Sequence, residues 1–436
     1  MNSSATFCYI RMIICPFHPP RRTLPMSTET PLLLRHHRPF LAFWLARIFT
    51  ASGFQMLTVA IGWNLYQLTG NVLDLGLVGL VEFAPRVLFM LHTGHVADRY
   101  DRRKVAALCQ TLQALIALSL AIGSLTDQVS REMIFILAFL LGGARSFEMP
   151  TTQALLPSIV PATLFPRAVA AAQSAQQLAT IVAPAVGGLL YAFGSVWIYG
   201  PTVALYVISC LLMLNLPARQ TPLNKAKATL DSLLAGIRFI RSRPDILGAI
   251  SLDLFAVLLG GATALLPVFA KDILLTGAWG LGLLRSAPAV GALLMSLWLA
   301  RFPVERKVGR IMFTAVGVFG VATIAFGLST SFWFSLAVLV VLGAADMISM
   351  VIRASFVQLE TPDEMRGRVS AVNGLFIGAS NQLGEFESGL TAHWFGTVPA
   401  VVLGGIGTLV VTGTWMKLFP TLANRDRMHE RQPETA

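Results

Sequence analysis

Several charged side chains lie inside long apolar stretches of this sequence. On membrane-insertion scales an uncompensated charge there costs about 2.5 to 3.5 kcal/mol at the helix centre. Carboxylates in such places can carry protons, and guanidinium groups can bind anions, so each needs either a partner or a polar cavity. These residues are Arg47, Glu82, Arg86, Arg145, Glu148, Asp253, Asp346, Arg353 and Glu385.

Glu82 and Arg86 are four residues apart with the acid first, which is the favourable order for a pair on one helix face. We predict a structural ion pair, and a gating contact is the alternative. Glu385 belongs to a small and polar stripe with helical spacing, which favours packing against another helix. A proton path is the second interpretation of this stripe, which is formed by Gly374, Gly378, Asn381, Glu385 and Ser388.

Common catalytic motifs of enzymes are absent from the sequence. There is no H-E-x-x-H, no G-x-S-x-G and no cluster of His, Asp and Cys that predicts a metal or nucleophile site. The phosphate-binding motif G-x-x-x-x-G-K-[ST] is also missing, which excludes an ATP-driven pump in this chain. Cys109 and Cys210 lie in apolar stretches and are typical of buried small residues. We therefore expect neither an enzyme nor a cofactor or metal, and a membrane-embedded enzyme is the less favoured alternative.

The composition places the chain in a lipid bilayer. Of its 436 residues 55% are hydrophobic and 13% are charged, with a mean hydropathy of +0.67. Soluble proteins carry about 25% charged residues. The net charge of +11 resides in short clusters between apolar stretches, without the continuous basic face that a nucleic acid would need.

Apolar stretches long enough to cross the bilayer as helices of about 20 residues occur twelve times. The sequence predicts an all-α multi-pass membrane protein with twelve transmembrane helices in two six-helix halves. The predicted segments are 40–66, 72–95, 105–126, 133–155, 168–193 and 196–216 in the first half, and 246–270, 279–300, 309–329, 332–355, 369–395 and 398–419 in the second.

The turns between these segments alternate in charge. Basic residues crowd both tails, the turns 94–104, 301–310 and 359–368, and the interval 217–245. The turns near 70, 194, 330 and 397 carry no Lys or Arg, and Arg131 and Lys271 are the only basic residues in the other two. By the positive-inside rule both termini are expected in the cytoplasm, which requires an even number of spans.

Five regions follow from this pattern. Residues 1–39 form a cytoplasmic tail, in which 1–25 resemble a mis-assigned start because Met26 opens a more ordinary polar beginning. Residues 40–216 and 246–419 form the two halves, and 420–436 form the second tail. The linker 217–245 contains apolar residues at helical spacing, from Leu230 to Ile240, which predicts an amphipathic helix on the inner leaflet.

The turn from Gly94 to Lys104 carries a specific motif. Gly94, Asp98, Arg99 and Arg102 fit the pattern G-x-x-x-D-R-x-x-R, with Arg103 following. The turn resembles the loop between segments two and three of the major facilitator superfamily of transporters. We expect Gly94 to permit close helix packing, Asp98 to meet a helix end or a basic group, and the arginines to hold the turn at an anionic surface.

A second motif lies in the fifth segment. Its small residues and proline are similar to the G-x-x-x-G-P-x-x-G-G signature of major facilitator exporters, although two glycines are replaced by alanine. An ordinary packing seam of small residues is the alternative. The motif positions are Ala179, Ala183, Pro184, Gly187 and Gly188.

The two halves are related to each other. Gly187, Phe193 and Gly194 have counterparts 202 residues later in Gly389, Phe395 and Gly396. Weak internal symmetry of this kind is typical of transporters whose site lies between two repeats.

Three short sequence segments indicate a particular branch of this superfamily. They are 147–150 with 155–157, 265–267, and 361–369. Together they are similar to the enterobactin-exporter branch, also called the transmembrane secretion effector group, which includes macrolide efflux proteins. The resemblance extends over about residues 35 to 420.

This resemblance implies that segments one, four, seven and ten surround a central cavity. The cavity candidates are then Arg47, Arg145, Glu148, Asp253, Asp346 and Arg353, with Glu385 as a further coupling candidate. Asp346 lies nearer the middle of its span than Asp253, and Arg353 is two turns away on the same face, too far for a direct pair in a straight helix. Arg47 and Arg145 are predicted to be within reach of Asp346 from neighbouring helices. We expect Asp346 to exchange a proton for substrate, and a permanent ion pair that holds the tenth segment in place is the alternative.

The resemblance implies a transporter in the plasma (inner) membrane that functions as a monomer. It predicts a proton-coupled exporter of an amphipathic small molecule, such as a siderophore, a macrolide or another drug, driven by the proton gradient without a cofactor. An importer or facilitator on the same fold is the alternative.

Overall fold

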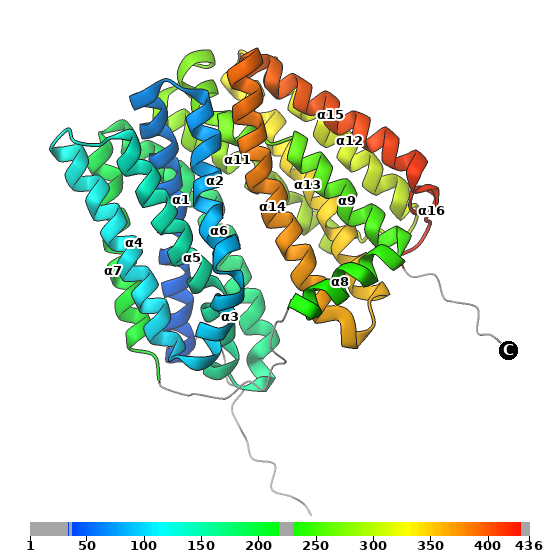
Figure 1. Ribbon diagram of the computed structural model, residues 1–436, viewed down its shortest axis with the longest axis horizontal. Coiled ribbons are helices and arrows are strands. Elements are labelled where there is room, and N and C mark those ends of the chain that lie inside the picture. The colour runs from blue at the N-terminus through cyan, green and yellow to red at the C-terminus, as the bar shows by residue number, and fades with distance from the viewer. Residues whose placement is uncertain (1–33, 35–36, 218–229, 429–436) are drawn as a thin grey trace, which may run out of the picture.

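The computed structural model describes residues 34, 37–217 and 230–428, and its regular elements there are all helices (Figure 1). The first half contains α1 (Arg38–Thr69), α2 (Val72–Leu88), α3 (Met90–Arg99), α4 (Arg102–Leu125), α5 (Arg131–Ile159), η2 (Ala162–Leu164), α6 (Phe165–Ala192) and α7 (Ser195–Leu214). The second contains α8 (Leu230–Ser242), α9 (Pro244–Leu259), η3 (Ala262–Leu265), α10 (Leu266–Val268), η4 (Phe269–Ile273), α11 (Gly277–Arg301), α12 (Val308–Gly327), α13 (Phe332–Glu360), α14 (Asp363–Phe395), α15 (Thr397–Leu418) and α16 (Pro420–Ala423).

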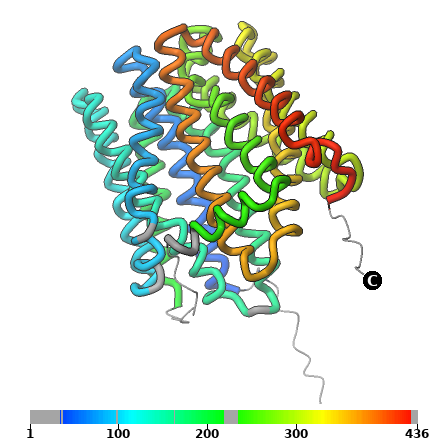
Figure 2. Tube along the Cα trace, turned by 45° about the vertical axis from the view of Figure 1, so that its right-hand side comes forward, coloured from blue at the N-terminus to red at the C-terminus, as the bar shows by residue number. Residues whose placement is uncertain are grey.

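The helices form two bundles that lie side by side, α1 to α7 and α9 to α15 (Figures 1 and 2). Two helix pairs join the bundles, because α6 packs on α11 and α2 packs on α14. One buried apolar cluster includes residues of both bundles, among them Leu57 and Leu65 of α1 with Leu281 of α11 and Phe326 of α12. The bundles therefore share a core where these pairs meet.

Ten helical segments in the described part are long and apolar enough to cross a membrane. The predicted span 72–95 is not one of them, since it is divided at Phe89 into α2, of 17 residues, and α3, of 10 residues. Pro85 lies inside α2, four residues earlier, and it cannot donate to the carbonyl oxygen of Val81, which weakens the helix one turn before the break. The continuous span expected at 72–95 is thus wrong.

The predicted span 246–270 is one of these ten segments, but its helix is interrupted. Helix α9 ends at Leu259, and after Gly260 and Gly261 the chain passes through the short elements η3, α10 and the π-helix η4 as far as Ile273. Helix α14 corresponds to the predicted span 369–395 and is not among the ten segments either. It is continuous over 33 residues, but its charged first turns and Glu385 make it more polar than the other spans.

Local sequence explains several helix ends. The side chains of Asn71, Asp101 and Ser130 accept hydrogen bonds from the first turns of α2, α4 and α5. Gly194 and Gly396 have φ values of 125° and 88° and link the last two helices of each half. Because this backbone region favours glycine, the two related positions need the same residue for the same reason.

The linker helix α8 packs on protein. Ile240 is 2% exposed and lies in one apolar cluster with Val369 and Val372 of α14 and Ile250 of α9. Leu234 on α8 is 55% exposed, so only part of the apolar surface faces outward. The helix is thus anchored on the second half; the side chains of Leu230 and Leu233 lie outside the described part.

Candidate transport site

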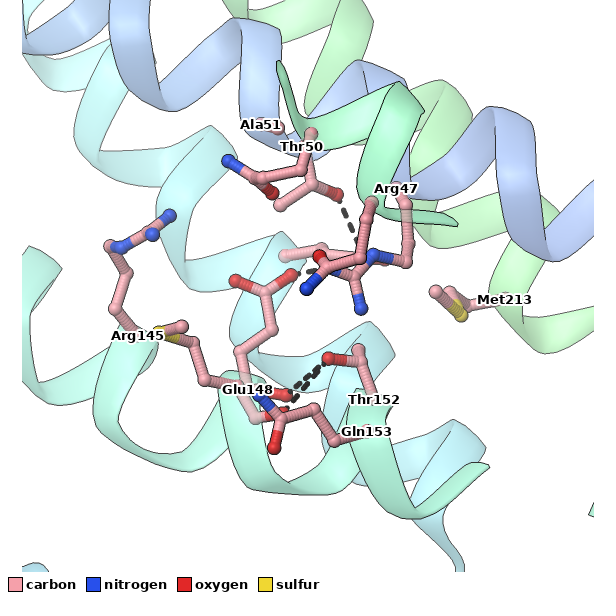
Figure 3. A pocket seen from close by; sticks show the side chains of 12 residues that line it. Arg47, Thr50, Ala51, Arg145, Glu148, Thr152, Gln153 and Met213 are labelled. Carbon is pink, nitrogen blue, oxygen red and sulfur yellow. Dashed lines mark hydrogen bonds between the residues drawn. The ribbon is translucent and has the colours of Figure 1, made fainter. Parts of the chain in front are cut away.

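A cavity of about 280 Å³ lies inside the first half, between α1, α4, α5, α6 and α7 (Figure 3). Its wall is rich in polar side chains, unlike the helix surfaces that face lipid. The lining residues that bear on its chemistry are Arg47, Thr50, Gln110, Arg145, Glu148 and Gln176.

Glu148 on α5 is the acidic centre of this cavity and is only 4% exposed. Its carboxylate accepts hydrogen bonds from Nε2 of Gln113 at 2.8 Å and from Nε2 of Gln110 at 3.3 Å. The Gln110 amide also donates to Thr50 on α1, whose hydroxyl lies 2.6 Å from that of Ser209 on α7. A buried polar network therefore fixes the carboxylate between α1, α4 and α7.

Two arginines flank this carboxylate. The Glu148 side chain lies between Arg47 and Arg145 in Figure 3, and both guanidinium groups interact electrostatically with it. Arg145 places its Cζ atom 3.5 Å from the centroid of the Phe54 ring, and its buried Nε atom has no hydrogen-bond partner in the described part. With two cations around one anion, the cavity has an excess of positive charge.

The second half brings Asp253, Asp346 and Arg353 together. Arg353 forms an ion pair with Asp253 on α9, and both residues are buried. Asp346 shares a small pocket with Asp253 and Ser349, and no hydrogen bond or ion pair of Asp346 occurs among the described residues. This site therefore contains a neutralised aspartate beside an unpaired one.

The expectation that Arg47 and Arg145 reach Asp346 is wrong in this conformation. Both arginines line the cavity around Glu148 in the first half, and the charges that act on Asp346 are those of Asp253 and Arg353. The spacing of Arg353 and Asp346 along α13 correctly predicted that the two residues form no direct ion pair. It could not reveal that Arg353 reaches across to α9.

A third group of charges lies where the two halves meet. The predicted ion pair of Glu82 and Arg86 is not among those formed by the described residues. Glu82 interacts electrostatically with Arg86, and also with Arg145 of α5 and Arg285 of α11. Arg285 also interacts with Glu385 of α14, so it interacts with carboxylates from both halves.

Arg285 is a residue that the sequence analysis missed. The sequence does contain an indication of its importance, because Arg285 is a charged residue inside the predicted span 279–300. Glu385 itself lies against α2: a Cβ atom added to Gly79 would be 2.7 Å from its Oε2 atom. This places the stripe of α14 that carries Glu385 at the contact between the halves.

The segment-five motif also lies at this contact. Its residues Ala179, Ala183, Pro184, Gly187 and Gly188 are all buried. A Cβ atom on Gly188 would be 2.8 Å from the Cα atom of Gly282 on α11. Gly389 of the second half, which corresponds in the repeat to Gly187, makes a second close contact, since a Cβ atom on Gly389 would be 2.8 Å from Cα of Gly76 on α2. Two glycine-on-glycine crossings thus hold the halves together.

The turn after α3 has a different role from the one expected for Gly94. A Cβ atom on Gly94 would meet nothing within 4 Å, so the close helix approach predicted there is wrong in this conformation. The break at Phe89 redirects α3, which places Gly94 away from a neighbouring helix. The side chain of Asp98 lies outside the described part, and Arg99 is exposed.

The arginines of this turn bind the ends of other helices. Arg102 donates to the carbonyl oxygen of Ala154 on α5 at 3.2 Å, and Arg103 donates to that of Leu216 after α7. Arg103 also forms an ion pair of 2.8 Å with Asp101, and hydrogen bonds from this guanidinium hold the pKa of the Asp101 carboxyl below its usual range. The turn therefore joins three helix ends.

Among proteins of known function, the chain is similar to the enterobactin exporter EntS of Escherichia coli O1:K1 / APEC. The two are 27% identical over 380 residues, which is 87% of each chain. This similarity extends over both halves.

Solved structures share the fold. The nucleoside transporter NupG superposes with a TM-score of 0.66 and 17% identity, covering 87% of this chain and 99% of NupG. A bacterial homologue of the iron transporter ferroportin, in an inward-facing state, gives a TM-score of 0.67 and 19% identity, covering 89% of this chain and 99% of the other.

The family of transmembrane secretion effectors matches residues 27–433 of the sequence. The predicted two-half transporter fold and the narrower family resemblance are both confirmed. The relatives are transporters, which also confirms that the chain is not an enzyme. The protein thus belongs to the transmembrane secretion effector family of major facilitator superfamily transporters.

Proposed function

We propose that this transporter exports an amphipathic organic molecule with anionic or phenolic groups in exchange for protons. The observation that carries the proposal is the division of charge between the halves. The first half offers an arginine-flanked cavity, and the second offers the unpaired carboxylate of Asp346. The similarity to a protein named as an enterobactin exporter supports export of a siderophore or a drug-like molecule.

The cavity supports binding of such a cargo through Arg47 and Arg145. Guanidinium groups bind carboxylates and phenolates through charge-assisted hydrogen bonds, and the neighbouring glutamines supply neutral donors and acceptors. Glu148 holds these arginines in place and limits their net charge. An empty cavity of this size accommodates only part of a large siderophore or macrolide, so the cargo would extend towards the second half.

Asp346 is the proposed proton carrier. Asp253 is neutralised by Arg353, whereas Asp346 lies beside Asp253 without a cation of its own. A proton on Asp346 removes the repulsion between the two carboxylates, so binding and release of that proton can bias rocking of the halves.

The same proposal includes the setting of the protein. It lies in the plasma (inner) membrane with both termini in the cytoplasm, and one chain suffices for transport. Rocking of the halves about α2–α14 and α6–α11 would expose the cavity to each side in turn.

The test uses the purified full chain in proteoliposomes with an imposed pH gradient. A catecholate siderophore and a macrolide serve as candidate cargoes, and transport is followed in both directions. Asp346→Asn should abolish uphill transport driven by the pH gradient while leaving cargo binding and downhill exchange unchanged. Asp127→Asn is the matched control, since Asp127 is exposed on a turn with a φ of 52°, a conformation that asparagine tolerates.

Uphill transport that persists in Asp346→Asn would refute the proton role of this residue. Asp253 and then Glu385 would become the candidates. Cargo movement that ignores the pH gradient in the unmodified protein would favour the alternative of a facilitator.

A further inference from the structure

Two apolar grooves lie on the outer faces of the bundles, away from the transport cavity. The first has a volume of about 530 Å³ and lies between α3, α4 and α5. Its lining contains no charged residue, and several members are strongly exposed, such as Leu108 at 71% and Tyr100 at 59%. The other lining residues include Phe89, Val96, Leu112 and Phe147.

The second groove has a volume of about 330 Å³ and lies between α11, α12 and α13. Its wall is formed by Met295, Ile311, Val318, Val341 and Ile348. Two cations, Lys307 and Arg310, also line it at the start of α12, and both are exposed. The groove therefore combines an apolar channel with a cationic end.

The two grooves occupy related places in the two halves. Each lies between the second, third and fourth spanning segments of its half, and each reaches the basic turn that connects the second segment to the third. In the first half, the groove is lined by Tyr100 and Val105 where it reaches this turn. Arg99 and Lys104 of the turn are exposed there. Asp101, an acid of the same turn, is neutralised by Arg103.

The cationic end of the second groove is held in position by the chain beyond α16. Lys307 has a φ of 54°, which is uncommon for a residue other than glycine. Its backbone amide donates to Oδ1 of Asp426 at 3.1 Å, and the amide of Gly309 donates to the carbonyl oxygen of Arg425 at 3.0 Å. These bonds fix the backbone that presents Lys307 and Arg310.

We propose that each groove binds an acyl chain of an anionic phospholipid, whose headgroup contacts the basic turn at its end. The apolar lining matches a hydrocarbon chain, and the exposed cations match a negatively charged headgroup at the membrane surface. A transported cargo fits less well, because α4 and α5 separate the first groove from the cavity. Gln110 and Gln113 of α4 face Glu148, while Leu108 and Leu112 face the groove.

Lipid binding to the purified full chain tests the proposal. Dioleoyl phosphatidylglycerol and dioleoyl phosphatidylcholine are titrated separately into delipidated protein, and bound lipid is counted by native mass spectrometry. We expect tighter binding of phosphatidylglycerol, and about fivefold weaker binding for each groove cation that is removed. Lys307→Ala combined with Arg310→Ala should weaken it, whereas Arg301→Ala combined with Lys417→Ala should not, since these exposed cations do not line the groove.

A second variant separates groove binding from general surface charge. Val318→Trp would fill the second groove without changing a cation, and Val318 is already 41% exposed, so folding should persist. We expect it to remove one tightly bound phosphatidylglycerol, while Leu297→Trp, on an exposed part of α11 outside the groove, retains it. Equal binding of both lipids, or no effect of the groove variants in folded protein, would overturn the proposal and indicate ordinary annular lipid. Displacement of the bound lipid by a macrolide would assign the groove to cargo instead.

Discussion

Glu148 controls the charge of the transport cavity because its carboxylate lies between Arg47 and Arg145. Its hydrogen bonds with Gln110 and Gln113 keep it there, so the two cations are only partly available to a cargo. A change in this single charge should therefore alter the affinity for anions without a large change in fold.

We expect Glu148→Gln to tighten binding of an anionic cargo by about tenfold, because a nearby repulsive charge is removed in a site of low effective dielectric. Arg47→Gln should weaken binding by a similar factor. Equilibrium binding to the purified protein, with an uncharged analogue of the same cargo as control, measures both effects. A loss of binding in both variants would contradict the electrostatic role and indicate damage to the hydrogen-bond network.

At the scale of helices, the glycine-on-glycine crossings determine how closely the halves approach. Gly188 meets Gly282 between α6 and α11, and Gly389 meets Gly76 between α2 and α14. Backbone atoms lie on both sides of these contacts, so an added methyl group can be accommodated only if the helices separate. Gly94, in the motif turn, has open space instead.

We therefore expect Gly188→Ala to shift the population away from this conformation and Gly94→Ala to be tolerated. A single reporter cysteine, Ala278→Cys, is placed in protein lacking its own four cysteines, since Ala278 is 6% exposed beside Gly188. Maleimide labelling of this reporter should rise severalfold in the Gly188 variant alone. Unchanged labelling would mean that this crossing does not control separation of the halves.

Asp98 in the turn 94–104 is expected to be needed for transport. Asp98→Asn should impair uphill transport while folded protein remains in the membrane, because Asp98 is proposed to meet a basic group or a helix end during the cycle. Transport assays on proteoliposomes with equal amounts of protein measure this. Normal uphill transport would reduce the turn to a topological anchor built by Arg102 and Arg103.

At the scale of the whole molecule, the conformation is closed at one end of the halves. Tyr66 of α1 donates a hydrogen bond to Asp272 of η4, and Lys271 lies 5.0 Å from the centroid of the Tyr66 ring. These contacts lie by the turns that carry few basic residues. The positive-inside rule predicts that this end faces outward, so we expect these contacts to close the outer end of the halves.

Orientation has a direct test. Reporter tags inserted within 218–229 or at the C-terminus should report a cytoplasmic location, and a tag at the turn near 330 should report an external one. Reporter enzymes that are active on only one side of the membrane make the measurement. Termini on opposite sides would contradict the even number of spans.

The class of protein, the approximate bounds of its spans and the basic turns could all be predicted from the amino-acid sequence. These are local properties, because crossing a bilayer requires a certain length of apolar helix wherever that helix lies. It also identified many of the charged residues that need a partner, but not Arg285 or Asp74, which is buried and pairs with Arg131. The motif at 94–104 and the small residues of segment five indicated the family for the same local reason.

Which charged side chains contact one another could not be predicted from the sequence and became clear from the packing of the helices. Arg353 forms its ion pair with Asp253 of α9 and not with Asp346 of its own helix, and Arg285 interacts with Glu82 and Glu385 from opposite halves. Spacing along one helix predicted a direct ion pair of Glu82 and Arg86, whereas Glu82 also interacts with Arg145 and Arg285 of other helices. The partner of a buried charge depends on the rotation and crossing of several helices, and these are set by contacts such as that of Gly188 with Gly282, which are distant in sequence.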